Sequence, residues 1–275
     1  MRFRLGFRNK VAIDLGTFRI RTAVGTSCPR EFSSSVARHD GAVVNLADLV
    51  LSLKPLLKKA VFLGVGKPYV LVCAPSDTTA DSREILLEAM LEAGAASVVV
   101  TPEPLAAAIG AGLDVSSQYS QMVVDMGEGL TDCAVLQTGR IITSSTLRVG
   151  CAALRRSIAS GCDCGLTEAE LLLRAIGLKF DNNCPAGYIK ALKSAMLPVS
   201  AMITRFLHDL PAVTGAEIIE NGVVLTGGGA LLPGAGDYLE ELTNIKFIVA
   251  EQPLTAVIRG AQSMLPVVAT LKQWS

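Results

Sequence analysis

Two aspartates, each followed two residues later by a glycine, are the side chains of this sequence best suited to phosphate and metal chemistry. Asp14 precedes Gly16, and Asp125 precedes Gly127 and Gly129. A carboxylate binds a hydrated divalent cation, and a glycine-containing turn lets successive backbone amides reach one anion. For this purpose we expect Gly127 and Gly129 to adopt positive φ angles. Both turns are therefore predicted to bind phosphate with a metal ion beside it.

Each turn lies between two apolar runs, which predicts one β-hairpin over residues 11–24 and another over residues 123–136. An Ala-Val pair follows the aspartate at the same offset in both, as Ala23-Val24 and Ala134-Val135. A single Asp-x-Gly turn between strands is most often only a turn. Two copies at one spacing favour two similar half-molecules whose hairpins face one nucleotide.

The glycine run Gly227, Gly228 and Gly229 is a third candidate, and it follows the apolar residues 223–226. Glycines leave room for a ligand because they lack Cβ atoms, and a helix N-terminus after them favours phosphate. The spacing differs from the dinucleotide motif and from the P-loop, whose lysine is missing. The run predicts nucleotide binding at the end of a buried strand.

Glu103 begins a helix rich in alanine and glycine. Its carboxylate is a candidate for orienting an attacking water, because Pro104 fixes the start of the helix. The alternative is a helix N-terminal glutamate that interacts favourably with the macrodipole. The small side chains of this helix, over residues 103–113, predict a close crossing with a second Gly/Ala-faced helix at residues 253–264.

The remaining segments have the pattern of an α/β protein. Residues 69–74 and 97–100 predict parallel strands, which helix 82–94 joins by a right-handed crossover. Helical spacing also occurs in residues 46–59, where Pro55 disturbs it, and in residues 187–208. A further helix is predicted to begin at Thr167, which caps it, with Glu170 three residues on.

The composition is that of a globular chain with a large core. Half of the 275 residues are hydrophobic, 18% are charged, and the formal net charge is zero. A neutral chain has no global attraction to nucleic acid, so no nucleic-acid partner is predicted. Seven cysteines, partly within apolar runs, favour free thiols in a cytoplasm. Cys162, Cys164 and Cys184 lack the spacing typical of a zinc site.

The first ten residues carry four cations together with Phe3, Leu5 and Phe7. This mixture suits an anionic membrane surface, and the alternation of the apolar residues equally suits the start of the first strand. Every long apolar stretch is interrupted before the ~20 residues that a spanning helix needs. We therefore expect a chain that does not span a membrane, with these ten residues as the candidate for contact with its inner face.

Five segments carry a family likeness in their order and detail. They are Asp14–Thr17, Glu103–Gly110, Asp125–Thr131, Leu225–Ala230 and the helix containing Arg259-Gly260-Ala261. Together they resemble the actin and heat-shock-chaperone ATPase superfamily, and in detail the bacterial actins of the MreB and MamK type. The resemblance implies an actin-like (ribonuclease H-like) fold in which two similar α/β domains with mixed sheets flank a nucleotide cleft.

The resemblance also implies the ligands and the residues that hold them. ATP and Mg²⁺ are the expected cofactors, with Asp14 and Asp125 as metal ligands and with Glu103, Asp125 and Thr131 in catalysis. The other nucleotide contacts that it implies come from both hairpins, the Glu170 helix and the glycine run: Gly16, Thr17, Phe18, Arg19, Arg21, Gly127, Glu128, Gly129, Leu130, Glu170, Leu173, Gly227, Gly228, Gly229 and Ala230.

Some of these positions depart from the family pattern. Glu128 stands where MreB proteins have a glycine, and Leu130 replaces a threonine. Arg21 lies where actin has a phosphate-contacting lysine, and Phe18 occupies a usually small position. Leu173 stands where MreB has a lysine beside the purine. These departures predict weaker nucleotide binding than is typical of the family.

The domain limits that follow are residues 1–118, completed by the C-terminal helix 254–275, for domain I and residues 119–253 for domain II. Shortened segments imply that subdomains IB and IIB are reduced. The leading hypothesis is a weak Mg-dependent ATPase that self-associates into membrane-associated cytoskeletal filaments, as a cell-shape and cell-wall synthesis scaffold in the cytoplasm. The alternatives are a magnetosome filament like MamK and a non-polymerising, chaperone-like or degenerate nucleotide-binding scaffold that resembles EutJ.

Overall fold

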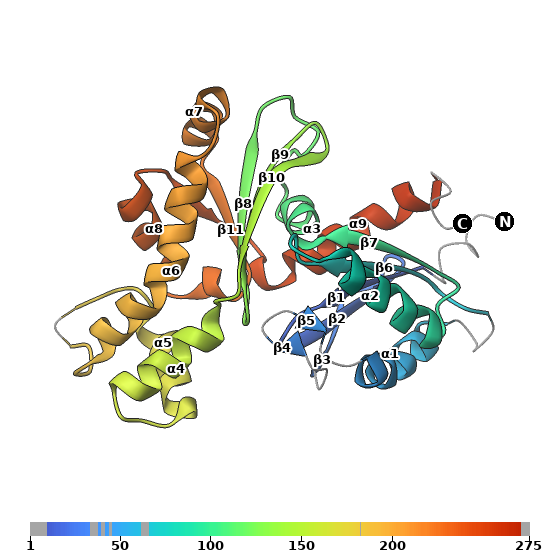
Figure 1. The fold of residues 1–275 in the computed structure, drawn as a ribbon, viewed down its shortest axis with the longest axis horizontal. Helices are drawn as coiled ribbons and strands as arrows, with labels where there is room; N and C mark the ends of the chain where they lie inside the picture. The colour runs from blue at the N-terminus through green and yellow to red at the C-terminus, as the bar shows by residue number, and fades with distance from the viewer. Residues whose placement is uncertain are drawn as a thin grey trace. The chain divides into compact units, whose positions relative to one another are not determined.

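The computed structural model describes residues 10–33, 38–39, 42–43, 46–61, 66–181 and 183–270. The chain divides into two compact units (Figure 1): unit 1 comprises Met1–Leu113 with Thr255–Ser275, and unit 2 comprises Asp114–Leu254. Each unit is built on one five-stranded sheet. The membrane contact predicted for the first ten residues concerns a segment that, apart from Lys10, lies outside the described residues.

The sheet of unit 1 has the strand order β3-β2-β1-β6-β7. The β1–β2 and β2–β3 pairs are antiparallel, whereas the β1–β6 and β6–β7 pairs are parallel. The first predicted hairpin is therefore confirmed as β1–β2, and the predicted parallel pair as β6–β7. The strands are β1 (Lys10–Leu15), β2 (Arg19–Val24), β3 (Arg30–Ser33), β6 (Tyr69–Ala74) and β7 (Ser97–Pro102).

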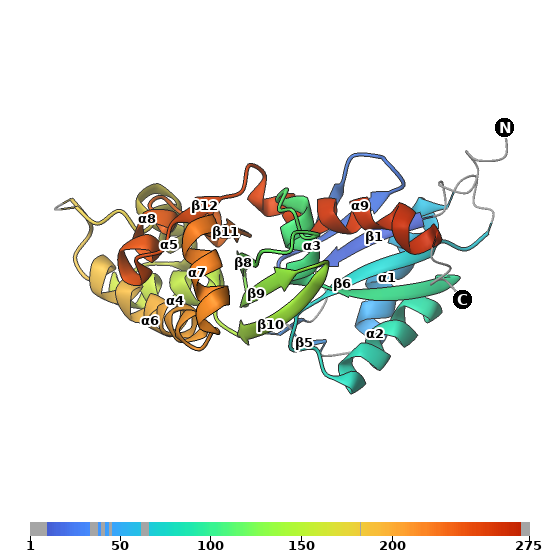
Figure 2. The ribbon, with the colours of Figure 1, turned by 90° about the horizontal axis from the view of Figure 1, so that it is seen from above.

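Helices cover both faces of this sheet, with α1 and α2 on one side and α9 on the other (Figure 2). Leu49, Leu53 and Leu57 recur every four residues along α1, so they form one apolar stripe, which packs in a core with Ile13 of β1. Pro55 faces solvent, and α1 continues through it. The helices are α1 (Leu46–Ala60), α2 (Ala80–Glu92), α3 (Glu103–Gly110) and α9 (Ala256–Thr270), and a separate short pair is formed by β4 (Arg38–His39) and β5 (Ala42–Val43).

Helices α3 and α9 cross at backbone contact within unit 1. A Cβ atom on Gly110 would lie 1.8 Å from the Ala256 carbonyl oxygen, and one on Gly260 would lie 1.8 Å from the Ala106 carbonyl oxygen. Neither glycine can therefore be replaced without separating the helices. The crossing that the small side chains predicted is confirmed.

The sheet of unit 2 repeats that of unit 1, with the order β10-β9-β8-β11-β12. Its β8–β9 and β9–β10 pairs are antiparallel, and its β8–β11 and β11–β12 pairs are parallel. The second predicted hairpin is confirmed as β8–β9. The strands are β8 (Gln121–Met126), β9 (Thr131–Gln137), β10 (Arg140–Leu147), β11 (Val223–Thr226) and β12 (Phe247–Val249).

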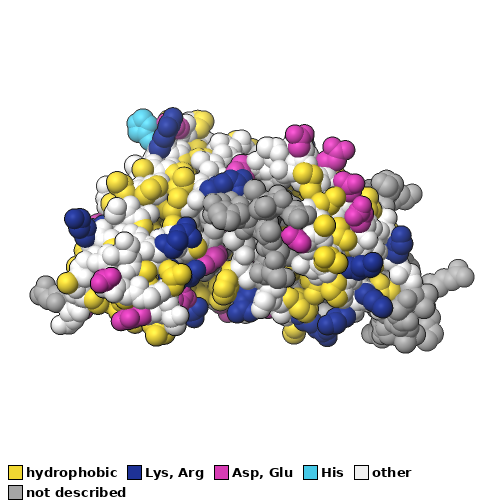
Figure 3. All heavy atoms as spheres, turned by 60° about the horizontal axis from the view of Figure 1, so that its bottom comes forward, with side chains coloured by type: hydrophobic (Ala, Val, Ile, Leu, Met, Phe, Trp, Pro, Cys, Tyr) yellow, Lys and Arg dark blue, Asp and Glu magenta, His cyan; other side chains and the backbone are white. Residues whose placement is uncertain are grey.

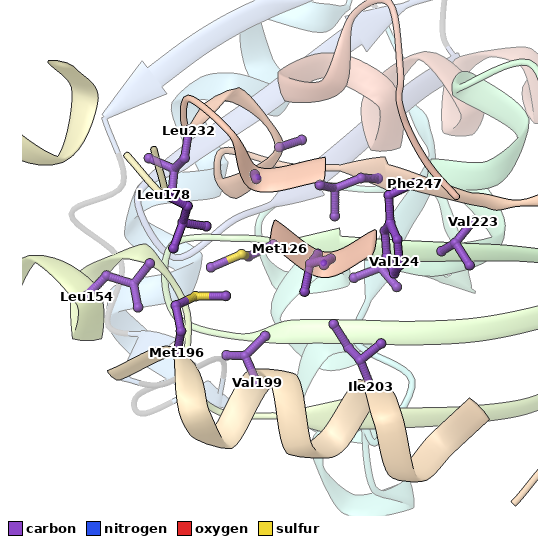
Figure 4. Close-up of a cluster of buried hydrophobic side chains, with 14 of the residues drawn as sticks. Val124, Met126, Leu154, Leu178, Met196, Val199, Ile203, Val223, Leu232 and Phe247 are labelled. Atoms are coloured by element: carbon purple, nitrogen blue, oxygen red, sulfur yellow. The ribbon is translucent and has the colours of Figure 1, made fainter. Parts of the chain in front are cut away.

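The core of unit 2 lies between this sheet and its helices (Figure 4). Val124 and Met126 of β8 point into it, and Met196, Val199 and Ile203 line the facing side of α6, at helical spacing. The helices are α4 (Cys151–Gly161), α5 (Leu166–Ile176), α6 (Tyr188–His208), α7 (Ala212–Asn221) and α8 (Ala235–Thr243), with a short 3₁₀ helix, η2 (Gly229–Leu231).

Two local expectations differ from the structure in unit 2. Thr167 does not cap α5: the helix begins at Leu166, Gly165 holds the cap position, and no side-chain cap bond is made. A helix after the glycine run was also expected, but η2 has only one turn there and α8 begins later, at Ala235. Neither α5 nor α8 begins with a side-chain cap hydrogen bond, and a glycine holds the cap position in both.

The surface and the helix lengths agree with the composition. Both basic and acidic side chains lie on the face shown in Figure 3; on its right-hand part the acidic ones gather towards the upper edge and the basic ones lower down. Among the described residues, no helix combines the length and the apolar character that crossing a membrane requires.

Candidate functional site

The first hairpin holds a buried carboxylate next to the end of β1. Asp14 is 5% exposed and lies opposite Arg21 across the β1–β2 ladder. Arg21 Nη1 is 3.3 Å from Asp14 Oδ2, and its Nε donates to Glu31 Oε1 at 2.7 Å. Burial by itself would lower the pKa of Arg21, but the carboxylates of Asp14 and Glu31 outweigh it and raise the pKa. The predicted site residues Asp14 and Arg21 therefore form an ion pair.

Residues 16–18 form the turn between β1 and β2. A Cβ atom on Gly16 would lie 2.7 Å from the Arg19 carbonyl oxygen, so the tightness of the turn requires glycine. Phe18 is 55% exposed, and the Arg19 guanidinium lies 4.9 Å from its ring centroid. The bulky Phe18 side chain thus projects from the turn beside a cation.

The second hairpin places Asp125 at the position that corresponds to Asp14. Asp125 is 7% exposed, and its Oδ1 accepts a hydrogen bond of 2.9 Å from Thr226 Oγ1. The residue opposite is Asp132, whose Oδ1 accepts from Thr146 Oγ1 at 2.9 Å. Two buried aspartates therefore occupy opposite positions of the β8–β9 ladder, and sequence reasoning singled out only the first. The offset of seven residues, shared with Asp14 and Arg21, could have identified Asp132.

The turn of the second hairpin differs from the expectation in its glycine conformations. Neither Gly127 nor Gly129 adopts a positive φ angle, so that prediction is wrong. The Gly127 amide donates to the Leu130 carbonyl oxygen at 2.8 Å, and a Cβ atom there would lie 3.2 Å from the same oxygen. Gly127 thus serves a close turn, as Gly16 does, rather than a left-handed backbone.

The N-terminus of α4 is attached to this turn. Cys151 and Ala152 donate their amides to the carbonyl oxygens of Gly127 and Glu128 at 3.0 and 2.9 Å. A Cβ atom on Gly150 would lie 2.5 Å from the Gly127 carbonyl oxygen, so glycine permits the approach. The first amides of a helix have no partner within the helix, and here the turn supplies one.

A chain of ion pairs continues from the turn through α4 to α5. Arg155 Nη2 binds Glu128 Oε1, and Arg155 Nη1 donates to Glu170 Oε2 at 2.7 Å. Arg174 binds the other oxygen of Glu170. Burial would raise the pKa of Glu170, but the bonds from Arg155 and Arg174 lower it. The predicted site residues Glu128 and Glu170 are therefore joined by Arg155, which sequence reasoning missed because it lies 27 residues from Glu128.

Three further predicted site residues have side chains that are buried within unit 2. Thr131 is fully buried, and its hydroxyl donates to the Val149 carbonyl oxygen at 2.8 Å. Leu173 is 2% exposed and belongs to the core of unit 2, and Leu130 is buried as well. Thr131 and Leu173 are thus both packed inside the unit, and the roles implied for them stay predictions.

The glycine run has two structural positions and one open position. A Cβ atom on Gly227, whose φ is 82°, would lie 2.4 Å from the Met126 carbonyl oxygen, and one on Gly229 would lie 2.4 Å from the Met126 side chain. On Gly228 it would meet only Leu254 Cδ2, at 3.9 Å. Packing on β8 explains Gly227 and Gly229, whereas Gly228 leaves space that a ligand can use. Ala230 is buried.

The residue predicted to orient water has its backbone fixed at the start of a helix. Glu103 is the first residue of α3 and is buried within unit 1, the same unit as Asp14. Within the described part of the chain, no group of three or more His, Cys, Asp or Glu side chains could hold a metal. Mg²⁺ is typically held by one or two carboxylates together with substrate phosphates. Asp14 in unit 1 and Asp125 in unit 2, each beside a turn, are each a carboxylate of the kind that such a donor set uses.

The repeated units define the class of the protein, which is an actin-like fold with two domains. MreB5 of Spiroplasma citri bound to AMPPNP aligns with a TM-score of 0.82 at 20% identity, covering 96% of this chain and 98% of that one. The MamK double helical filament aligns with a TM-score of 0.76 at 15% identity, over 93% and 98%. The ethanolamine utilization protein EutJ from Carboxydothermus hydrogenoformans gives a TM-score of 0.67 at 21% identity, over 92% and 88%.

The chain belongs to the MreB/Mbl protein family, whose sequence profile matches residues 33–161 and 185–273. The cell shape-determining protein MreB of Escherichia coli is 34% identical over 229 residues, which cover 73% of this chain. That match covers 66% of the relative, slightly less than two thirds of its length. The cell shape-determining protein Mbl of Bacillus cereus is 28% identical over 291 residues, covering 93% of this chain and 87% of the relative.

Proposed function

We propose that this MreB-like actin homologue binds and slowly hydrolyses ATP with Mg²⁺. The observation that carries the proposal is the repeated hairpin, which places a buried aspartate and a tight glycine turn at the same register in each unit. The structures of MreB5 bound to AMPPNP and to ADP support the choice of nucleotide.

In this proposal each hairpin contributes a carboxylate and backbone amides. Asp14 and Asp125 hold Mg²⁺ and its waters, and the turns at residues 16–18 and 127–130 bind the phosphates. Bound Mg²⁺ neutralises charge that develops on the phosphates. Glu103 orients the attacking water, since it is fixed at a helix start and buried.

The nucleoside is bound by the other predicted residues that remain accessible. Glu170 is partly exposed at its carboxylate and serves the ribose, and the open space at Gly228 accommodates the adenosine. The exposed Phe18 and the ion-paired Arg21 lie beside the first turn, where Arg21 contributes positive charge to the phosphate site.

We further propose that the chain self-associates into filaments at the cytoplasmic face of the membrane, as a scaffold for cell shape and cell-wall synthesis. The family membership and the likeness to the MamK filament support self-association. The basic and aromatic residues 1–10 support the membrane contact. The fold of EutJ supports the alternative, a non-polymerising scaffold with reduced subdomains IB and IIB.

Light scattering combined with phosphate release in Mg-ATP tests this function. The wild type is expected to scatter and to release phosphate, and Glu103→Gln to scatter without releasing it. Glu92→Gln is the matched control, because Glu92 is exposed at the end of α2. If no protein scatters but ATP stabilises the chain, by about 2.7 kcal/mol at 100 times its Kd, the EutJ-like scaffold is supported instead.

A further inference from the structure

Arg155 compensates the negative charge of Glu128 in the second turn. Its guanidinium binds Glu128, within the turn, and Glu170, on α5, through separate nitrogens. The side chains of Arg155 and Glu128 are 21% and 20% exposed, so water screens the pair only in part. An arginine fork suits this arrangement because its planar donors bind two carboxylates at once.

The position of Arg155 is fixed by the same contacts that fix the turn. The first amides of α4, from Cys151 and Ala152, donate to the carbonyl oxygens of Gly127 and Glu128. Arg155 lies one helical turn beyond Cys151, so its side chain reaches back towards the turn. Backbone and side-chain contacts therefore bind the turn to α4 at two places.

The pKa of the buried Cys151 thiol is affected by the charged side chains where α4 meets the turn. Burial, followed by the charges of Glu128 and Glu170, raises the pKa of Cys151 to about 12, and the Arg155 charge acts in the opposite direction. The two carboxylates thus create a negative potential at the turn, which Arg155 partly cancels. A bound phosphate would meet the same potential.

We propose that Arg155 is a specificity-determining positioning residue, which neutralises Glu128 so that the turn at residues 127–130 accepts the phosphates of a nucleotide. This inference rests on the proposed function. Both terminal nitrogens of Arg155 are engaged by carboxylates, so it acts as a counter-ion and not as a phosphate ligand. Without it, the unpaired carboxylate of Glu128 repels the phosphate charge, and the repulsion grows with the number of phosphates.

Calorimetric titrations of ATP, ADP and adenosine test this role. Arg155→Met is expected to weaken ATP binding about tenfold, ADP binding less, and adenosine binding by less than about twofold. The double variant Glu128→Gln/Arg155→Met is expected to restore ATP affinity to within about twofold of the wild type. Arg156→Met is the matched control, since Arg156 is the next residue of α4 and is exposed; it should leave all three affinities unchanged.

Two results with these variants would overturn the inference while leaving the proposed function intact. An equal loss for ATP and adenosine would show that Arg155 acts through Glu170 or through the fold and not through phosphate charge, and a double variant as weak as Arg155→Met would show that Glu128 is not the repelling group. A wild type that binds no ATP would overturn the proposed function itself, which separates the two failures. If Arg155→Met does not fold, Glu128→Gln alone decides: ATP binding is expected to tighten by about threefold, and an unchanged affinity contradicts the proposal.

Discussion

In unit 1, Asp14 faces Arg21 across the hairpin, whereas in unit 2 Asp125 faces Asp132 at the corresponding position. The backbone register is the same in the two hairpins, but the two aspartate carboxylates have different partners. Asp14 is held by an ion pair, and Asp125 by the neutral hydroxyl of Thr226. The comparison teaches that two hairpins can share one register although their buried carboxylates have different hydrogen-bond and ion-pair partners.

The largest effect is expected from adding one methyl group to each turn. Gly16→Ala should lower the free energy of unfolding by about 2 kcal/mol, because the new Cβ atom would lie 2.7 Å from a backbone carbonyl oxygen. Gly127→Ala, with the corresponding distance at 3.2 Å, should cost less than about 1 kcal/mol. Urea denaturation midpoints measure both. Equal losses would show that the two turns are equally tight.

The second prediction compares the Arg21–Asp14 ion pair with the hydrogen bond from Thr226 to Asp125. Arg21→Met should destabilise the protein by roughly 2 kcal/mol, and less at high salt, because it removes the Arg21–Asp14 ion pair. Thr226→Val should cost about 1 kcal/mol at every salt concentration, since it removes a hydrogen bond from a neutral hydroxyl. Thermal denaturation from 0.05 to about 1 M NaCl distinguishes them. A salt-dependent loss in Thr226→Val would contradict the assignment.

The smallest effect concerns pH and is confined to unit 2. Since the folded-state pKa of Glu170 is lowered, its ion pairs stabilise the protein above its unfolded pKa of about 4.3. That contribution is lost as pH falls through the lowered folded pKa. Glu170→Gln should therefore show a shallower loss of stability below about pH 5 in acid titration. If the stability of Glu170→Gln falls with pH as steeply as that of the wild type, the ion pairs of Glu170 do not contribute to the acid dependence of stability.

The sequence predicted the repeated elements well because their signals are local. The equal offsets after Asp14 and Asp125 are confirmed as hairpins of the same register. The small side chains of α3 and α9 likewise predicted their crossing, because only glycine and alanine allow helix backbones to touch.

The side-chain environments were harder to predict because they depend on tertiary packing. Thr131 begins β9 and lies against Val149, and Leu173 faces the core from α5; no local pattern reports these contacts. Arg155 reaches Glu128 only because α4 docks on the turn. The sequence could not show why residue 127 is a glycine: the reason is the close approach of the Leu130 carbonyl oxygen and not a positive φ angle.

The most direct test of the central claim, that both hairpins bind one nucleotide with Mg²⁺, is a calorimetric titration of Mg-ATP into the wild type, Asp14→Asn and Asp125→Asn. We expect one ATP per wild-type chain and a loss of affinity of about tenfold or more in each variant. Circular dichroism confirms that the variants are folded. Wild-type affinity in either variant, or no binding to the wild type, would contradict the account.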